Sequence, residues 1–340
     1  MFQADIAHHY NHYTTTYTTT YTTTYNYHHH SITVLYTMPR SLLLTIDAFG
    51  TLFHPRLPVP DQYASTAHAF GLSPSLLTSE SLQPAFKAVF KAHAKQYPNY
   101  GRELALRGCY GGPRQWWEEV IRGSFARALD NNGDLPEGLV QRLLDRFASR
   151  EGYALYDDAG EFFARMREVK SRLAMQQRFG PFERVVVGVL SNSDDRVPGV
   201  LKSLGLRVGD TRADQGVSSM RLAGFEERSS SSTPSSEEGG HANDLDLIIT
   251  SYEAGEEKPN PAIFEVAKRQ AMRLCDDGGD VSNWACVHVG DDYNKDYRAA
   301  IDAGWEGYYL PREGDSQVQQ QDAKTIHSLS DLFDILEGYK

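Results

Sequence analysis

The residues best suited to chemistry are Asp47 and the short turn that follows it. Asp47 comes directly after the apolar run Leu42–Ile46, a pattern that indicates a buried strand. Ligands of open α/β sheets bind outside the carboxyl ends of the strands, so this carboxylate is well placed to meet one. Gly50 allows the backbone to bend sharply over a bound group. Two residues after Asp47 stands Phe49, whose ring can neither donate nor accept a proton.

Other polar side chains follow later apolar runs in the same way. They are Ser191 and Asn192 after Val185–Leu190, Lys258 shortly after Leu245–Thr250, and Asp291 and Asp296 after Ala285–Val289. Each of them alone is an ordinary turn or capping residue. Their shared place after successive strands predicts that they meet in one crevice.

Such a group of residues suits phosphoryl chemistry. A carboxylate such as Asp47 can attack a phosphoryl group and form an acyl phosphate, which water then hydrolyses. Neighbouring carboxylates repel one another unless a hard cation bridges them, and Mg²⁺ prefers such oxygen ligands. We expect Asp47, Asp291 and the backbone carbonyl of Phe49 to bind Mg²⁺. Asp296 either orients Lys258 or binds Mg²⁺ through water.

The remaining polar groups suit a phosphate. We expect Ser191 and nearby backbone N–H groups to hold the phosphate oxygens, and Lys258 to supply positive charge beside nucleophile and phosphate. The candidate catalytic residues are therefore Asp47, Lys258 and Ser191. The candidate residues for binding a small phosphorylated substrate are Ser191, Asn192, Lys258, Gly50 and Thr51.

The elements that must position these residues alternate along the chain. Strands are expected at Leu42–Ile46, Val185–Leu190, Leu245–Thr250, Ala285–Val289 and Gly307–Leu310, and helices at Arg196–Leu204, Pro261–Leu274 and Lys295–Ala303. This alternation favours an α/β fold with a doubly wound parallel sheet.

A long, mostly helical stretch separates the first two strands. Helices are expected at Gln62–Phe70, Ser81–Tyr97, Arg114–Leu129 and Leu135–Ser149, and a further one, Gly160–Met175, leads back into the sheet. We therefore expect residues 57–154 to be an inserted all-helical module, and residues 39–56 and 155–340 to form the core. The Trp116-Trp117 pair and the preceding Tyr97–Gly101 lie either near a substrate or, as is commoner for aromatic residues, within helix packing.

Two segments have the composition of disordered chain. Residues 1–38 contain the repeat Tyr13–Tyr25 with flanking histidines and almost no aliphatic residues, so we expect a disordered tail rather than a metal-binding tract. Met38 is then close to the start of the folded protein. Residues 208–243 include a Ser-rich run and are expected to be a disordered surface insertion, because long loops cost little free energy.

The composition of the chain argues against a nucleic-acid partner and against insertion into a membrane. The formal net charge of −11 disfavours a nucleic acid, and the apolar runs are far too short to cross a membrane. Cys109, Cys275 and Cys286 have no metal-like spacing. We therefore expect an intracellular protein of the cytoplasm or nucleus that is not secreted. The sequence sets no oligomeric state.

The order and character of these motifs resemble the haloacid dehalogenase (HAD) superfamily. Within it, the stretches Tyr97–Gly101, Arg114–Trp117, Leu190–Arg196, Lys258–Phe264 and His288–Tyr293 are similar to the branch called haloacid dehalogenase-like hydrolase domain-containing protein 3. The resemblance covers nearly all of residues 40–310 apart from the Ser-rich insertion. It implies a Rossmann-like core, a helical cap at residues 57–154 and a hydrolase ancestry, but no substrate.

The chain departs from the superfamily's phosphatases at Phe49. The resemblance implies an acid there, which protonates the leaving oxygen and activates water, and general acid–base catalysis contributes about 10²–10⁴-fold. Superfamily dehalogenases have an aromatic residue at this position, whereas Gly290-Asp291-Asp292 is typical of a Mg²⁺ site. His54 either replaces the missing acid or is an ordinary loop histidine.

Three functions therefore stay open. The first, which we favour, is a Mg²⁺-dependent phosphatase with weakened acid–base catalysis, which forms an aspartyl-phosphate and acts on a small phosphorylated metabolite. The second is a non-catalytic binding or regulatory protein that keeps the phosphate pocket, because fold does not imply function. The third is a metal-independent 2-haloacid dehalogenase. Whether the chain is an enzyme is thus open, with a phosphoric monoester hydrolase favoured.

Overall fold

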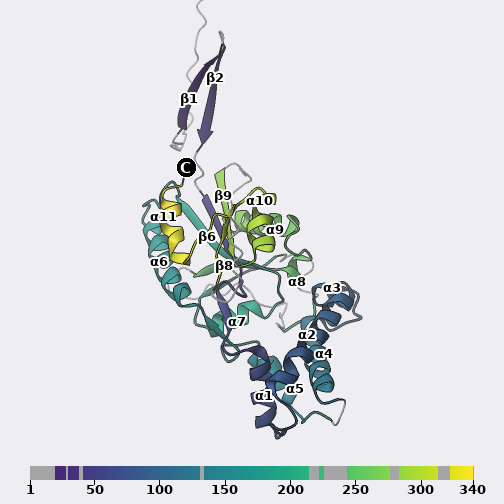
Figure 1. Ribbon diagram of the computed structural model, residues 1–340. Coiled ribbons are helices and arrows are strands. Elements are labelled where there is room, and N and C mark those ends of the chain that lie inside the picture. Colours follow the sequence, from purple (N-terminus) through teal and green to yellow (C-terminus); the bar gives the residue numbers. More distant parts are fainter. Residues whose placement is uncertain are drawn as a thin grey trace, which may run out of the picture.

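The computed structural model describes residues 41–130, 134–213, 222–225, 243–275, 283–312 and 322–339, and two further strands near the N-terminus. Within these residues a six-stranded sheet lies at the centre of the molecule (Figure 1). Its strands are β3 (Ser41–Ile46), β6 (Arg184–Ser191), β7 (Val208–Thr211), β8 (Leu245–Thr250), β9 (Trp284–Gly290) and β10 (Glu306–Tyr309).

The sheet is parallel throughout, with the order β10-β9-β3-β6-β8-β7. The chain runs from β3 outward to β6 and later returns to the other side of β3 with β9. The strand order therefore reverses at β3, and ligands bind at such a reversal. The predicted α/β fold with a Rossmann-like, doubly wound sheet is confirmed.

Alternate side chains of each strand build two separate cores. Leu42, Leu44 and Ile46 belong to one buried cluster, whereas Leu43 between them belongs to another, because successive strand residues point to opposite faces. Such strands, covered on both faces, are apolar throughout. This explains why the run before Asp47 has no polar face.

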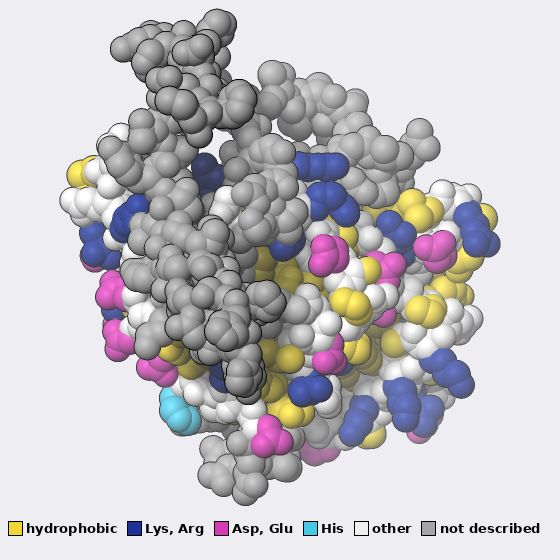
Figure 2. Space-filling model, turned by 90° about the horizontal axis from the view of Figure 1, so that it is seen from above, with side chains coloured by type: hydrophobic (Ala, Val, Ile, Leu, Met, Phe, Trp, Pro, Cys, Tyr) yellow, Lys and Arg dark blue, Asp and Glu magenta, His cyan; other side chains and the backbone are white. Residues whose placement is uncertain are grey.

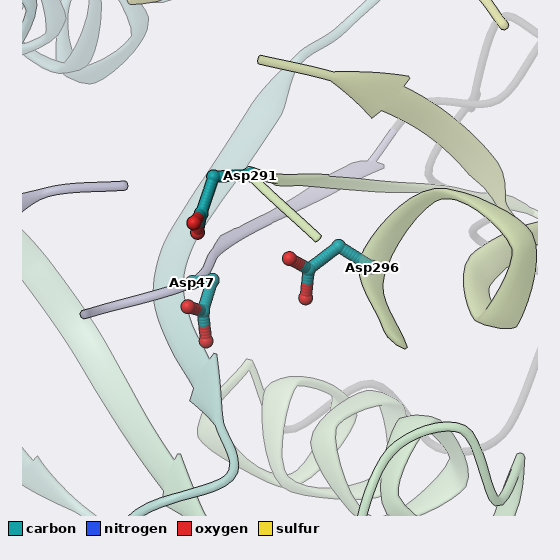
Figure 3. A group of neighbouring side chains, drawn as sticks. All are labelled: Asp47, Asp291 and Asp296. Atoms are coloured by element: carbon teal, nitrogen blue, oxygen red, sulfur yellow. The ribbon is translucent and has the colours of Figure 1, made fainter. Parts of the chain in front are cut away.

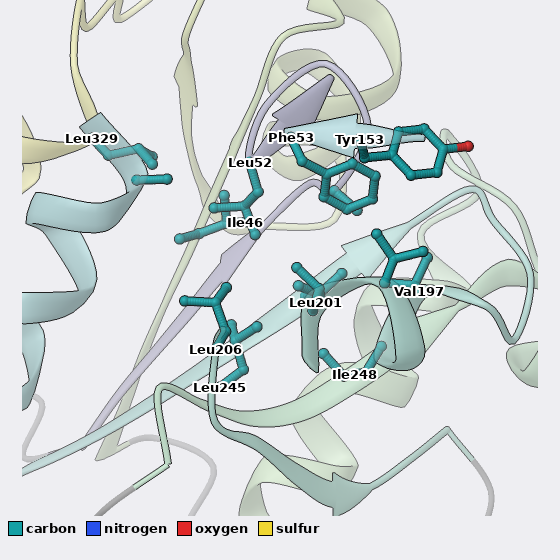
Figure 4. Close-up of a cluster of buried hydrophobic side chains, with 14 of the residues drawn as sticks. Ile46, Leu52, Phe53, Tyr153, Val197, Leu201, Leu206, Leu245, Ile248 and Leu329 are labelled. Carbon is teal, nitrogen blue, oxygen red and sulfur yellow. The ribbon is translucent and has the colours of Figure 1, made fainter. Parts of the chain in front are cut away.

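Helices cover both faces of the sheet. On one side lie α6 (Asp157–Ala174), the 3₁₀ turn η4 (Leu329–Asp331) and α11 (Leu332–Glu337), and on the other α9 (Ala262–Leu274) and α10 (Ala299–Asp302) (Figure 1). The shorter helices α7 (Val197–Ser203) and α8 (Ser251–Ala254) follow β6 and β8. Figure 4 shows the first of the two cores, where Ile46 of β3 lies among side chains such as Leu52, Leu201 and Ile248.

A helical group joins the sheet through a short ribbon. In this ribbon β4 (Phe53–Pro55) pairs antiparallel with β5 (Tyr153–Leu155). Between these strands come α1 (Val59–Ala69), α2 (Ser79–Gln96), α3 (Pro98–Leu106), α4 (Gly112–Ala128) and α5 (Leu139–Arg146). These five helices form one group, which lies apart from the central sheet and the helices that cover it (Figure 1). The division of the chain into a core and a cap at residues 57–154 stays a prediction.

Two segments expected to be disordered contain strands. β7 is the edge strand of the sheet, although it falls within the insertion expected at residues 208–243. Near the N-terminus, β1 (Thr20–Tyr27) pairs antiparallel with β2 (His30–Thr37), which agrees with the high strand propensity of Thr and Tyr. The rest of the expected tail, and residues 214–221 and 226–242, lie outside the described residues.

The surface gives no sign of a single dominant charge on the face shown in Figure 2, where basic and acidic side chains are mixed beside apolar ones. Among the helices of the described segments, none combines the length and the apolar character that crossing a membrane requires.

Candidate active site

Three carboxylates converge at the carboxyl edge of the sheet (Figure 3). Asp47, Asp291 and Asp296 each offer an oxygen, and these oxygens lie within 4.8 Å of one another. Asp47 extends β3, because its N–H still donates to the carbonyl of Val289 at 2.8 Å. Asp291 directly follows β9, and Asp296 lies in η3 (Tyr293–Arg298), a π-helix, a rare element that is frequent at functional sites.

The carboxylates face a cavity of about 250 Å³. Its lining consists of Asp47, Phe49, Ser191, Asn192, Lys258, Asp291, Asp292, Lys295 and Asp296. Seven of these nine were predicted from the sequence, and Asp292 and Lys295 are additional. Strand ends far apart in the chain are thus brought to one place, as the sheet topology requires.

Lys258 is a buried cation that binds two of the three carboxylates. Its Nζ donates to Asp47 Oδ1 at 2.8 Å, to the carbonyl of Leu190 at 2.8 Å and to Asp296 Oδ1 at 2.5 Å. Burial alone would lower the pKa of Lys258, but the Asp296 and Asp47 carboxylates outweigh it and raise the pKa. Lys258 is therefore a cation at neutral pH, and its ammonium group lies beside the Asp47 carboxylate.

The backbone of Lys258 is held by Asn192. The Asn192 Nδ2 donates to the carbonyl of Lys258 at 2.8 Å, and the N–H of Lys258 donates to Asn192 Oδ1 at 2.7 Å. These bonds use the oxygen and one of the two N–H groups of the Asn192 amide, and Asn192, expected to bind phosphate, also lines the cavity. Ser191, the last residue of β6, is buried and lines the cavity.

Asp291 is positioned by the turn after Asp47. Its Oδ1 accepts a hydrogen bond from the Thr51 hydroxyl at 2.7 Å. Gly50 has φ +81°, and a Cβ there would overlap the Asp291 carboxylate, so glycine is required for this close approach. Burial and the nearby Asp47 carboxylate raise the pKa of Asp291 to about 7.

Thr51 differs from its predicted role. It is fully buried and its hydroxyl is occupied by Asp291 rather than open to the cavity. The turn's backbone geometry, with positive φ at Gly50, directs this side chain toward Asp291.

Asp296 has a different environment from Asp291. Its Oδ2 accepts from the N–H of Asp292 at 2.9 Å, while its Oδ1 meets Lys258 and lies 3.3 Å from His288 Nε2. Burial alone would raise the pKa of Asp296, but Lys258 and His288 outweigh it and hold the pKa well below its usual value. Of the two roles considered for Asp296, this geometry favours orienting Lys258.

Two residues behind the cavity were not singled out in the sequence. His288 on β9 is fully buried, and its Nδ1 lies 2.9 Å from the Thr45 hydroxyl on β3. Burial lowers the pKa of His288, so the ring is neutral. The sequence offered one signal for this pair, because each of the two residues is polar within an otherwise apolar run. Only the strand register shows that Thr45 lies directly beside His288.

Phe49 lines the cavity where the superfamily's phosphatases have an acid. Its ring packs edge-on against Phe53 at 4.6 Å and Tyr153 at 5.4 Å between ring centroids. His54 is not among the residues that line this cavity, and its Nδ1 instead lies 2.9 Å from the carbonyl of Pro55. The structure therefore gives no support to His54 as a substitute acid.

The aromatic segment of the helical group contacts the core away from the carboxylates. Asn99 Nδ2 donates to the carbonyl of Ser251 at 2.8 Å, and Trp117 Nε1 donates to Asp194 Oδ2 at 2.8 Å. Trp116 is buried and donates to the carbonyl of Tyr97 at 3.1 Å. Neither tryptophan lines the carboxylate cavity, in keeping with a packing role.

A buried ion pair completes this contact and was also missed. The Arg196 guanidinium binds Asp194 through two bonds of 2.9 Å and lies 4.4 Å from the centre of the Trp117 ring. Such a bidentate pair is geometrically specific. It links the segment after β6 to helix α4.

The donor set fits a hard divalent cation. All of the side-chain ligands are carboxylate oxygens, which Mg²⁺ prefers. The raised pKa of Asp291 reflects burial and the repulsion between two close acids, which a bound cation would relieve. Lys258 and Thr51 bind one oxygen each of Asp47 and Asp291, and no described hydrogen bond reaches the second oxygen of either, whereas both oxygens of Asp296 accept hydrogen bonds.

Comparisons with known proteins identify the family of the chain. The model of the haloacid dehalogenase-like hydrolase family matches residues 43–304. An uncharacterised protein of Saccharomyces cerevisiae is 29% identical over 285 residues, which cover 82% of this chain and 74% of the yeast protein. An uncharacterised hydrolase of Schizosaccharomyces pombe is 26% identical over 267 residues, covering 78% and 89%.

The bovine haloacid dehalogenase-like hydrolase domain-containing protein 3 is also similar. It is 25% identical over 303 residues, which cover 87% of this chain and 95% of the Bos taurus protein. The resemblance inferred from the sequence motifs is thereby confirmed.

Proposed function

Because the chain belongs to the haloacid dehalogenase-like hydrolase family, we propose that it is a Mg²⁺-dependent phosphatase with Asp47 as the nucleophile. One observation carries this proposal: Asp47 and Asp291 face the same cavity, and Lys258 Nζ lies 2.8 Å from the Asp47 carboxylate. This arrangement combines a nucleophile, a cation site and a fixed positive charge.

The residues of the chain have separate tasks in the reaction. Asp47 attacks phosphorus, the bond to the leaving oxygen breaks, and the phosphoryl group moves to the aspartate. Water then cleaves this acyl phosphate, which releases phosphate and restores the carboxylate. Lys258 stabilises the negative charge of the phosphoryl oxygens, and Ser191 holds one of them. Mg²⁺, held by Asp47, Asp291 and the carbonyl of Phe49, would neutralise further charge.

The cavity favours a small substrate with a good leaving group. Its volume of about 250 Å³ lies below the usual range for drug-sized ligands, which agrees with a small phosphorylated metabolite. Phe49 cannot protonate the leaving oxygen, and its ring is held in place by Phe53 and Tyr153. Esters whose alcohols are acidic should therefore react faster than alkyl phosphates.

Phe49 also favours a second candidate, a binding or regulatory protein that keeps the pocket without turnover. In that case phosphate and Mg²⁺ bind, but neither step of hydrolysis proceeds at a useful rate. The third candidate, a 2-haloacid dehalogenase, shares the aromatic residue but needs no cation.

The experiment compares three reactions of the purified full-length protein. Phosphate release from an aryl phosphate is measured with and without Mg²⁺, and halide release from a 2-haloacid is measured in chelator. We expect Mg²⁺-dependent phosphate release that falls about 10³-fold or more in Asp47→Asn. Asp302→Asn, on the exposed side of α10, is the matched control and should leave the rate unchanged.

The other outcomes separate the candidates. Halide release in chelator would establish the dehalogenase instead. Binding of Mg²⁺ and phosphate without any turnover would establish the binding protein.

We also propose that the protein lies inside the cell, in the cytoplasm or nucleus. Its three cysteines are all free thiols, which suits a reducing compartment. Cell fractionation that recovers the protein in the secreted fraction would contradict this location.

A further inference from the structure

A line of buried polar groups runs from the interior of the sheet to the nucleophile. Thr45 Oγ1 lies 2.9 Å from His288 Nδ1, and His288 Nε2 lies 3.3 Å from Asp296 Oδ1. The same Asp296 oxygen accepts from Lys258 Nζ, which also donates to Asp47. Thr45 and His288 do not line the cavity, so neither can touch a substrate.

The hydrogens along this line can be placed by elimination. A carboxylate only accepts, so His288 Nε2 must carry the proton that points at Asp296. Nδ1 of a neutral ring is then an acceptor, and the Thr45 hydroxyl donates to it. The hydroxyl also lies 3.3 Å from the carbonyl of Val287, but its bond to the imidazole is shorter.

These donors engage both carboxylate oxygens of Asp296. Oδ1 accepts hydrogen bonds from His288 and Lys258, and Oδ2 accepts one from the N–H of Asp292. The carboxylate also lies directly on the backbone of Gly290, where a Cβ would overlap it. Turning Asp296 toward a cation would break several of these contacts, each of which involves a buried or charged group.

We propose that His288 and Thr45 are positioning residues that commit Asp296 to Lys258 and keep it from binding the cation. The cation then has Asp47 and Asp291 as its carboxylate ligands, and Lys258 keeps its hydrogen bond to Asp47. This inference rests on the proposed function for its kinetic consequence, but its hydrogen bonds and its cation preference can be measured without turnover.

The first test observes the imidazole directly. ¹⁵N NMR of the full-length protein should show His288 as a neutral ring protonated at Nε2. In Thr45→Val, which keeps the shape of the side chain, the Nδ1 resonance should shift while Nε2 keeps its proton. A ring protonated at Nδ1, or at both nitrogens, would overturn the proposal.

The second test measures Mg²⁺ binding by calorimetry in the absence of substrate. Loss of a partner that supports a metal ligand typically weakens metal affinity about 10–100-fold. If Asp296 is not a ligand, Thr45→Val and His288→Phe should change the Mg²⁺ affinity by less than about threefold, whereas Asp291→Asn should reduce it by far more. A weakening about tenfold or greater in Thr45→Val and His288→Phe would make Asp296 a ligand and contradict the proposal.

The third test uses the aryl phosphatase reaction at saturating Mg²⁺. Thr45→Val should lower kcat about tenfold with KM unchanged, because Lys258 acts on the reacting group rather than on binding alone. Thr45→Ser, which keeps the hydroxyl, should restore kcat, and unchanged kcat in Thr45→Val would count against the positioning role. If the wild-type protein shows no turnover, the proposed function fails, while the NMR and binding results still decide this inference.

Discussion

Thr51 and Asp291 are joined by two hydrogen bonds. The Thr51 hydroxyl donates to Asp291 Oδ1 at 2.7 Å and accepts from the backbone N–H of Asp291 at 3.0 Å. The carbonyl of Thr51 in turn accepts from the Arg312 guanidinium, which also binds Asp158. One hydroxyl thus fixes both the main chain and the side chain of an expected cation ligand.

Replacing Thr51 should therefore affect cation binding as well as stability. In Thr51→Val the partly buried N–H of Asp291 loses its partner, which should lower the free energy of unfolding by about 1–3 kcal/mol. The freed carboxylate should also bind Mg²⁺ more weakly. Urea unfolding and calorimetric titration with Mg²⁺ measure the two effects. Thr51→Ser keeps the hydroxyl and is the matched control; equal loss in both variants would contradict this role.

Asn192 should act through the backbone of Lys258. Without the two bonds between its amide and Lys258, the loop that carries the ammonium group loses its anchor. Misplacement of a catalytic group by about 1 Å can cost 10²-fold, so Asn192→Ala should lower kcat about 10- to 100-fold. Steady-state kinetics on an aryl phosphate measures this change.

The control for Asn192 lies in the same loop. Asn260 accepts from the N–H of Ala262 at 3.0 Å at the start of α9 and does not contact Lys258 by any described bond. Asn260→Ala should leave kcat close to the wild-type value. A similar fall in both variants would mean that general loosening of the loop, rather than the Asn192 anchor, causes the effect.

Phe49→Asp should restore the missing acid. We expect phosphate release from an alkyl phosphate to rise about 10²-fold or more, because proton transfer to the leaving oxygen then becomes available. Release from an aryl phosphate should rise less, because its leaving group needs little protonation. The ratio of the two rates is the quantity to measure.

Phe49→Asn is matched to this variant, since it removes the same ring but cannot transfer a proton. Both variants lose the contacts with Phe53 and Tyr153. Equal rates in the two variants would show that steric opening, and not acid catalysis, is responsible.

The stability of the sheet should depend on pH through Asp244. This buried carboxylate accepts from Arg167 at 2.8 Å and from the N–H of Arg207 at 2.9 Å. Burial alone would raise the pKa of Asp244, but these donors outweigh it and lower the pKa below its usual value. A carboxyl group whose pKa is lower in the folded protein stabilises the fold above its unfolded pKa, and this contribution is lost as the pH falls through the folded pKa.

Asp244→Asn should therefore be less stable than the wild type by about 1–3 kcal/mol at pH 7. The difference should shrink below about pH 4, where the unfolded carboxyl group becomes protonated. Urea unfolding at several pH values measures it. Asp210→Asn is the control, because that side chain is 86% exposed; a pH-independent difference for Asp244→Asn would contradict the electrostatic explanation.

The sequence predicted most of the sheet and the residues at its carboxyl edge. Strands buried on both faces are continuous apolar runs, so β3 and β6 stand out from their surroundings. Asp47 and Ser191 are the residues that end these runs. Their meeting in one cavity then follows from parallel topology alone.

β7 was missed because it lacks that signal. It consists of Val208-Gly209-Asp210-Thr211, with one aliphatic residue, and it lies at the edge of the sheet, where burial is partial. No pattern of period two distinguishes so short a strand from a loop.

The sequence also could not predict which partners the side chains at the site would bind. Thr51 was expected at the phosphate, but the turn directs it to Asp291. Asn192 lines the cavity as expected, but nothing in the sequence indicated that its amide also binds the backbone of Lys258. Residue types and spacing identify which groups gather at the site, whereas their partners depend on backbone angles and strand register that the sequence pattern does not contain.

The ribbon of β4 and β5 has a consequence for how such chains diversify. Phe53 pairs with Leu155 and Pro55 with Tyr153, so the two ends of the helical segment lie side by side on paired strands. A helical segment of any length can be exchanged between paired ends without altering the sheet, since closing a longer loop adds little free energy. Evolution can thus replace the helical segment between β4 and β5 as one interchangeable part, while the residues at the carboxyl edge of the sheet are inherited unchanged.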